Sequence, residues 1–205
     1  MKVVLLVASL GTLASCGSVA PLPDDVFLRP ALPTTEVRAS GAQGWTNGEL
    51  RVAPVKAAGL YHERAIAYSD DDGASLRQHR YLFWLEPPEE IVRQSLIEHL
   101  RASGVAPQVV SQSSTAVSLE VVATIKRFEQ LVSAEGRAMQ AEVGFQIRTL
   151  PDGESVFNQS YRAREVCTEA TAAASALAMG RALDGVFTQF EHTANAVLQA
   201  RFAKE

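Results

Sequence analysis

The sequence predicts an α+β fold, in which a mainly antiparallel sheet with a meander is covered on one face by a mid-chain helix and a long C-terminal helix. Three segments from residue 118 onward alternate apolar and polar residues and are joined by short turns, as strands with one wet face do. Two other segments, at residues 88–100 and 183–197, place apolar residues three and four apart, the spacing of amphipathic helices.

The first 15 residues are typical of a bacterial lipoprotein signal peptide. Lys2 precedes an apolar run at residues 3–13, which is shorter than the roughly 20 residues that span a bilayer. The run ends in Leu13-Ala14-Ser15-Cys16, a lipobox in which small residues precede the cleavage site. We expect cleavage before Cys16, a diacylglyceryl group on its thiol and a further acyl chain on its new amino group. Because several acyl chains anchor stably, this covalent lipid predicts a lasting attachment to a membrane. The alternative is an ordinary secretory signal followed by an unrelated cysteine.

Residues 16–48 are predicted to form a lipidated tether. Four prolines interrupt regular structure here, although Val26-Phe27-Leu28 is compatible with a short edge strand. The segment 45–48 predicts a turn into the first secure strand. By similarity to the sorting rules of enteric bacteria, Gly17 in place of aspartate favours the periplasmic side of the outer membrane over the inner membrane. The predicted organisation is therefore a signal peptide at 1–15, a tether at 16–48 and a folded domain at 49–205.

The domain is predicted to begin with three strands and a helix. Strands are expected at 49–55, 65–68 and 76–84, with an Asp-rich turn at 70–73 before the third. The helix begins at Pro87-Pro88-Glu89-Glu90, because proline suits a first turn and acidic residues favour its dipole. Gly104 is expected to end it.

The second half of the chain is predicted as the meander and the last helix. The meander strands are expected at 118–129, 139–150 and 155–165, with Pro151-Asp152-Gly153 as a turn. The last helix is expected at 170–202, and its apolar stripe should cover the apolar face of the meander. The stripe consists of Leu183, Phe187, Phe190, Ala194 and Val197.

Composition limits the classes of function. The chain is 47% hydrophobic and 20% charged, as in globular proteins, and its net charge of −4 with no basic run gives no support for nucleic-acid binding. The chain has two cysteines. If Cys16 carries lipid, Cys167 has no partner for a disulfide and we expect it to be buried.

The chemistry-bearing residues form no recognisable catalytic or metal-binding pattern. His62, His79, His99 and His192 lack metal-ligand spacing and are predicted to be surface or half-buried residues. Residues 70–73 lack the ligand pattern of a calcium loop, and the helix start explains Glu89 and Glu90. The sequence also has no G-x-S-x-G elbow and no phosphate loop. We therefore predict no catalytic residue, no metal, no cofactor other than the lipid, and no enzymatic activity.

Trp84 is the one candidate for partner binding. Tryptophan is enriched at the centres of protein interfaces, which makes it a possible aromatic anchor. The alternative, which its aromatic and apolar neighbours favour, is a core residue at the corner between strand and helix.

Several motifs together resemble the ABC-type transport auxiliary lipoprotein family, which accompanies MCE-type lipid transport systems such as the paraquat-inducible system of enteric bacteria. The resemblance covers about residues 16–200, although family members often have an aromatic pair near the tether where this chain has only Phe27-Leu28. Besides the lipobox, the motifs are LRVAPV at 50–55, RAIAYS at 64–69, RYLFWLEPPEEIVRQSLIEHL at 80–100, RFEQ at 127–130 and AEVGFQIR at 141–148, before the long last helix.

This resemblance implies an accessory lipoprotein that docks to the periplasmic MCE subunit of an ABC permease and ATPase complex. Several copies could surround a central tube, so a homo-oligomer is compatible with the role. Two alternatives remain open from the sequence. One is a direct periplasmic lipid carrier, which requires an apolar cavity of a few hundred Å³, and the other is a periplasmic hydrolase.

Overall fold

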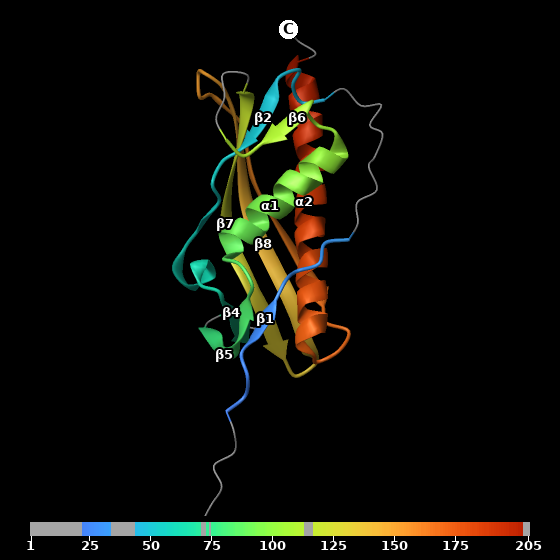
Figure 1. Ribbon diagram of the computed structural model, residues 1–205. Helices are drawn as coiled ribbons and strands as arrows, with labels where there is room; N and C mark the ends of the chain where they lie inside the picture. The colour runs from blue at the N-terminus through green and yellow to red at the C-terminus, as the bar shows by residue number, and fades with distance from the viewer. Residues whose placement is uncertain (1–21, 34–43, 71–72, 74, 113–116, 203–205) are drawn as a thin grey trace, which may run out of the picture.

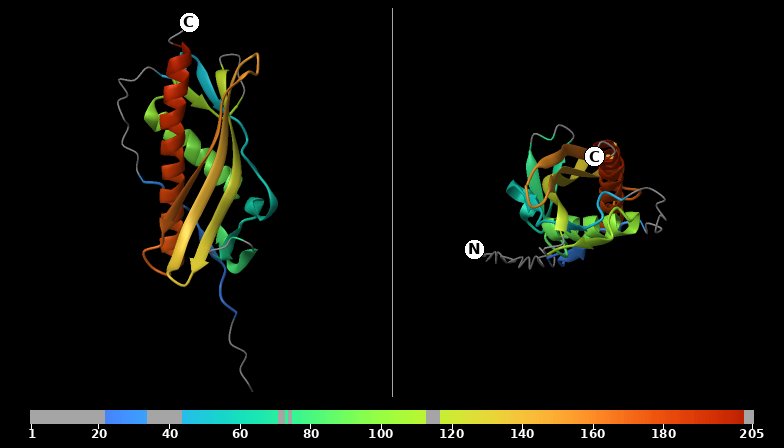
Figure 2. Two further views of the ribbon diagram at one scale, coloured as in Figure 1. Left: turned by 180° about the vertical axis from the view of Figure 1, so that it is seen from behind. Right: turned by 90° about the horizontal axis from the view of Figure 1, so that it is seen from above.

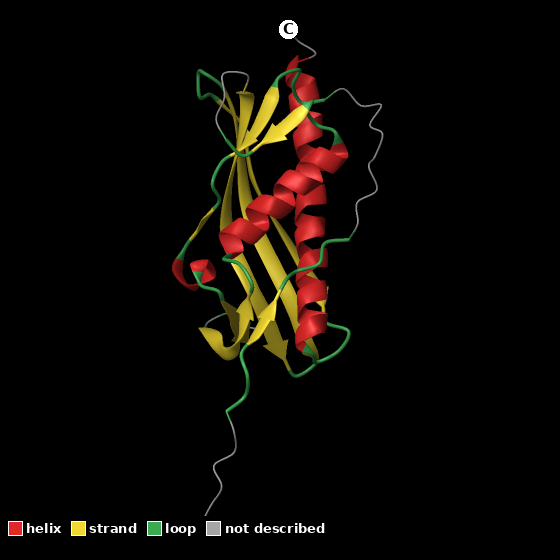
Figure 3. Ribbon diagram, in the orientation of Figure 1, coloured by secondary structure: helices red, strands yellow, loops and turns green. Residues whose placement is uncertain are grey.

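The computed structural model describes residues 22–33, 44–70, 73, 75–112 and 117–202. The domain is elongated, with a long twisted sheet on one side and two helices on the other (Figures 1 and 3). In chain order, the elements are β1 (Val26–Leu28), β2 (Glu49–Val52), β3 (Lys56–Ala57), the 3-10 helix η1 (Gly59–His62), β4 (Ala65–Asp70), β5 (Leu76–Trp84), α1 (Pro88–Ser103), β6 (Gln108–Val110), β7 (Val117–Ser133), β8 (Gly136–Thr149), β9 (Ser155–Val166) and α2 (Ala172–Phe202).

The sheet is built around β7, its longest strand. Along one edge, β7 pairs in succession with β2, β3 and β4, all parallel to it, and along the other it pairs with β8, antiparallel. Among the strand pairs of the described residues, five of eight are parallel: β1–β5, β2–β6, β2–β7, β3–β7 and β4–β7. The prediction of a mainly antiparallel sheet is therefore wrong, and the sheet is mixed. Parallel strands need a long connection, and the segment that runs through β5, α1 and β6 provides it between β4 and β7. The alternation of apolar and polar residues alone does not reveal strand direction.

The meander at β7–β8–β9 is confirmed, as is the strand 76–84. The strand expected at 49–55 is instead divided into β2 and β3, with Pro54 in the gap between them. Proline has no N–H with which to continue the ladder. The short strand β6 and the helix η1 were not predicted. β1 lies at an edge of the sheet beside β5, in agreement with an edge strand.

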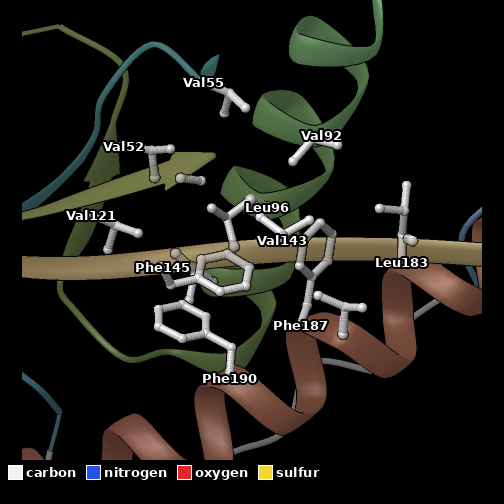
Figure 4. Close-up of a cluster of buried hydrophobic side chains, with 14 of the residues drawn as sticks. Val52, Val55, Val92, Leu96, Val121, Val143, Phe145, Leu183, Phe187 and Phe190 are labelled. Atoms are coloured by element: carbon white, nitrogen blue, oxygen red, sulfur yellow. The ribbon is translucent and has the colours of Figure 1, made fainter. Parts of the chain in front are cut away.

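Both helices pack against the same concave side of the sheet, as predicted (Figure 2). α1 begins after Pro87 with two acidic residues in its first turn and ends at Gly104, whose φ of 65° is the left-handed conformation that glycine adopts easily. Val92 and Leu96 of α1 meet Phe187 and Phe190 of α2 over Val143 of β8 and its neighbours (Figure 4). These side chains form one continuous core.

Part of the segment predicted as tether belongs to the folded domain. Leu28 of β1 is 8% exposed and Trp45 is 2% exposed, and both belong to the core. After β1, the chain passes close to α2 at Gly180, where an added Cβ would overlap the carbonyl group of Ala31. The absence of a side chain at position 180 is what lets the two backbones approach so closely.

Candidate functional site

The two ends of the domain differ, and α2 defines the axis between them. Its 31 residues correspond to about 46 Å of helix. β1, β4 and β5 lie toward the end where α2 begins, which we call the tether end (Figure 1). The last turns of α2 and the β8–β9 turn lie at the opposite end, which we call the far end (Figure 1).

A cavity of about 550 Å³ opens at the far end. It lies between the last turns of α2 and the ends of β7 and β8, beside the loop that leads into β2. Its lining consists of Gly44, Trp45, Thr46, Asn47, Gly48, Ser118, Leu119, Thr149, Leu150, Leu198 and Gln199. The volume falls within the range of small-molecule sites in proteins.

The apolar part of the lining is held rigidly from below. Leu119 and Leu198 are 2% and 1% exposed, and the Trp45 ring stands edge-on to Phe190 with 5.6 Å between ring centroids. Phe190 is itself stacked on Phe145 at 4.1 Å. The indole N–H of Trp45 donates to the side-chain oxygen of Asn195 in α2. These packed side chains form the floor beneath the cavity, and the half-buried Leu150 presents further apolar surface to it.

The polar lining residues among the described part of the chain are uncharged. The hydroxyl oxygens of Thr46 and Ser118 are 2.5 Å apart, and the backbone N–H of Gly48 donates to Thr46 Oγ1 at 2.9 Å. Asn47 and Gln199 are exposed at the rim. Since none of the lining residues that the structure describes is acidic, basic or a histidine, this lining suits an apolar group with neutral polar atoms better than an ion.

An ion pair connects α2 with the β8–β9 turn at the far end. Arg201 in the last turn of α2 contacts Glu154 beside the β8–β9 turn, with 2.7 Å between Nη2 and Oε2. The hydrogen bond from Arg201, together with its charge, lowers the pKa of the exposed Glu154 carboxyl. The pair bridges the end of α2 and the β8–β9 turn.

Of the residues singled out from the sequence, Cys16 lies outside the described residues, and Trp84 lies in the core. Trp84 is 1% exposed and stands edge-on to Phe128, with 5.3 Å between ring centroids. Trp84 does not line the far-end cavity, and its position agrees with the alternative of a core residue. The cavity was not predicted, because its lining comes from four separate parts of the chain.

His99 departs from the prediction of a surface or half-buried residue, since its side chain is 4% exposed. His99 Nε2 lies 2.9 Å from Glu191 Oε2, and the same oxygen accepts from Ser103 Oγ at 2.6 Å. A serine, a histidine and a glutamate thus meet between α1 and α2. The serine hydroxyl contacts the glutamate rather than the imidazole, and His99 and Ser103 are buried. The arrangement fits a contact that joins the helices and not a nucleophile activated by its base.

A second buried polar group lies at β7. Glu129 has a side chain that is 1% exposed and accepts from Arg127 Nη1 at 3.1 Å. Burial, together with the charge and hydrogen bond of Glu129, raises the pKa of the Tyr61 hydroxyl to about 12. The pairing satisfies Glu129, as buried carboxylates require.

The remaining candidates are structural. Cys167 is half-buried rather than buried, with Sγ 3.8 Å from Ser175 Oγ. Glu89 and Glu90 lie in the first turn of α1, as predicted. Within the part of the chain that the structure describes, no three His, Cys, Asp or Glu side chains gather as a metal site would need. Among these same residues, none of the helices combines the length and the hydropathy of a membrane span.

A comparison with protein-family models finds one match over most of the chain. The model described as "ABC-type transport auxiliary lipoprotein component" matches residues 28–190. A comparison with curated proteins finds no significant match.

Several solved structures share the fold. A crystal structure of a protein from Xanthomonas campestris matches with a TM-score of 0.75 and 18% identity, over 87% of this chain and 99% of that one. A hypothetical protein from Chlamydia trachomatis matches with a TM-score of 0.54 and 10% identity, over 76% of this chain and 99% of that one. At these identities the likeness establishes the fold.

Proposed function

The chain belongs to the ABC-type transport auxiliary lipoprotein component family, and from this membership we propose that it is a membrane-anchored periplasmic accessory lipoprotein of an MCE-type lipid transport system. The family is one of transport auxiliary proteins and not of enzymes. The proposed protein contributes anchoring and a binding surface, and ATP hydrolysis belongs to a separate cytoplasmic subunit.

In this proposal, the lipid on Cys16 attaches the tether end to the outer membrane, and the far end docks to the periplasmic MCE subunit. The observation that carries it is the far-end cavity, which has a rigid apolar floor and an uncharged rim. Tight interfaces place a few apolar anchor residues in such preformed, water-excluding pockets. An apolar side chain of the partner would fit the floor, and its backbone would meet the hydroxyl and amide groups of the rim.

The proposal is tested by immunoprecipitating the full protein from mildly solubilised envelope membranes and identifying the bound proteins by mass spectrometry. The wild-type protein should recover an MCE subunit together with an ABC permease and ATPase. The variant Gln199→Trp places a bulky ring at the rim of the cavity and should lose these subunits.

Ala200→Trp is the matched control, because Ala200 is exposed on the same turn of α2 but does not line the cavity. It should retain the partners. Circular dichroism of both variants establishes that they fold. Recovery of no MCE or ABC subunit by the wild-type protein would contradict the role, and equal recovery by both variants would contradict docking at the cavity.

The volume of the cavity also supports a second candidate, a direct lipid carrier. A single acyl chain with a neutral polar group would match the floor and the rim. Native mass spectrometry of the purified protein should then detect bound lipid in the wild-type protein and less in Gln199→Trp. Absence of any copurified lipid would count against this candidate and leave the docking role intact.

A further inference from the structure

Large apolar side chains are exposed mainly toward the tether end. The positions lie in or next to β1, after β5, at the last residues of β7 and β9, and in the second turn of α2 (Figure 1). Within the described residues, they are Leu22, Val26, Phe27, Leu85, Val132, Val166 and Leu177. Concentration of apolar surface in one region marks a place where another surface is met.

The most ordered part of this region is an aromatic pair at the sheet edge. Phe27 in the edge strand β1 is 51% exposed and stacks on its register partner Phe83, with 5.5 Å between ring centroids. The guanidinium carbon of Arg64 lies 5.2 Å from the centroid of the Phe27 ring. Leu85, directly after β5, is 41% exposed. We call Phe27, Phe83, Leu85 and Arg64 the edge patch.

The length of the chain places this patch near the proposed lipid anchor. Leu22 is six positions after Cys16 in the chain, and Phe27 is eleven positions after it. A fully extended chain covers at most about 3.6 Å per residue, so Leu22 stays within about 22 Å of the lipidated residue and Phe27 within about 40 Å. The tether therefore holds this end of a domain about 46 Å long close to the membrane.

We propose that the edge patch rests on the membrane surface, with the Phe27 ring inserted among the lipids at the level of the headgroups. This rests on the proposed acylation of Cys16. Aromatic and leucine side chains lie at this depth in interfacial proteins, and an arginine beside them reaches the lipid phosphates with its guanidinium while its stem stays apolar. The contact fixes the direction in which the far end points, since attachment at the single residue Cys16 would not by itself set the orientation of the domain.

The chemistry of the patch alone would also suit a second copy of the chain, pairing through the open edge of β1. The short reach from Cys16 favours the membrane, because the lipid surface is held beside the patch at a high effective concentration. A second copy would instead have to be recruited from elsewhere on the membrane.

The test uses the full lipidated protein in phosphatidylethanolamine and phosphatidylglycerol vesicles with brominated acyl chains, which quench indoles that enter the bilayer. Phe27→Trp adds an indole at the patch, whereas the native Trp45 and Trp84 are 2% and 1% exposed and remain inside the domain. Ala200→Trp adds an indole at the far end. Compared with vesicles without bromine, Phe27→Trp should lose emission and shift to shorter wavelength, and Ala200→Trp and the wild type should not change.

Mass spectrometry of the N-terminal peptide establishes lipidation first. An unmodified Cys16 would overturn the tether and this inference together. With Cys16 lipidated, an unquenched Phe27→Trp would overturn the membrane contact alone, and so would equal quenching at both positions. A Phe27→Trp indole that shifts to shorter wavelength only as protein density rises, with no quenching by bromine, would assign the patch to a second copy and likewise overturn the inference.

Discussion

The two ends of this domain treat apolar side chains differently: the far end recesses them below a cavity, and the tether end exposes them. The far end closes its apolar residues beneath an uncharged rim and leaves a cavity of about 550 Å³. The tether end leaves Phe27 51% exposed on an edge strand. An exposed apolar surface is suited to a partner that stays in permanent contact with it. A recessed apolar floor is suited to a partner that binds reversibly. The difference favours lipid at one end and a protein or a lipid cargo at the other.

Phe190→Ala breaks the far end most strongly. Phe190 is fully buried, with Phe145, Phe157 and Trp45 around it. Its truncation should lower the free energy of unfolding by about 3–5 kcal/mol, measured by urea denaturation. Leu177→Ala on the same helix is the control, since Leu177 is 49% exposed and its loss should cost far less. Equal losses would contradict a rigid floor.

Gly180→Ala breaks the tether end. The added methyl group would collide with the backbone of Ala31, so we expect a loss of about 1–3 kcal/mol and release of β1. Gly185→Ala is the matched control in the same helix, where the new Cβ would meet Ala163 Cβ at 3.4 Å, an ordinary contact. It should gain about 0.5–1 kcal/mol, because alanine favours a helix over glycine. Thermal unfolding distinguishes the two, and stabilisation by Gly180→Ala would contradict the close crossing.

Lowering the pH should reduce the stability of the protein through His79 at the tether end, by less than the two substitutions above. Burial lowers the pKa of His79 at the tether end below its ordinary 6.5. The hydrogen bond that the imidazole donates to Gln130 Oε1 opposes this shift, and the charge of Arg137 adds to it. The unfolded chain therefore takes up this proton first as pH falls. The contribution of His79 is present above pH 6.5 and is lost as pH falls below it toward the lower pKa of the folded state.

This contribution is measured by comparing urea unfolding of the wild type and His79→Gln over a series of pH values. The variant should show a weaker fall in stability below pH 6.5. Occupancy of the cavity should not follow this pH dependence, because no titratable side chain is among its described lining residues. Parallel curves for the two proteins would refute the role of His79.

The smallest effect is expected for Arg201→Ala at the far end. Its partner Glu154 is fully exposed, and exposed ion pairs contribute little to stability. The thermal unfolding temperature should hardly change. The pKa of Glu154 should rise to its ordinary value, which NMR titration of the carboxyl group detects. A large loss of stability would contradict this assignment of a weak surface ion pair.

The sequence predicted the long elements better than it predicted the pairing of the short strands. Elements with a long, regular pattern were predicted well: the alternation in β7, β8 and β9 and the stripe of α2 each depend on near neighbours in the chain. The partners of short strands were not, because three parallel strands share one edge of β7 and no local pattern specifies their order.

A change in the alternation of β7 and the composition of the segment around Trp45 explain two further differences between the prediction and the structure. A register shift between Ile125 and Arg127 moves Phe128 to the core and brings Glu129 inside, so the simple alternation fails there. Trp45 lies in a segment rich in glycine and polar residues that suggested a linker, yet its ring forms the floor of the cavity. The one signal in the sequence was a large aromatic residue within a stretch of small residues. Its role depends on long-range contacts with α2, which a local pattern does not reveal.

The central claim is that the domain is oriented, with lipid at the edge patch and the transport partner at the cavity. Photo-crosslinking in cells tests it most directly, with a photoreactive amino acid placed at position 27 in one strain and at position 199 in another. We expect crosslinks to an MCE or ABC subunit from position 199, and crosslinks to phospholipid without any protein adduct from position 27. A transporter subunit captured at position 27, or only phospholipid captured at position 199, would contradict it.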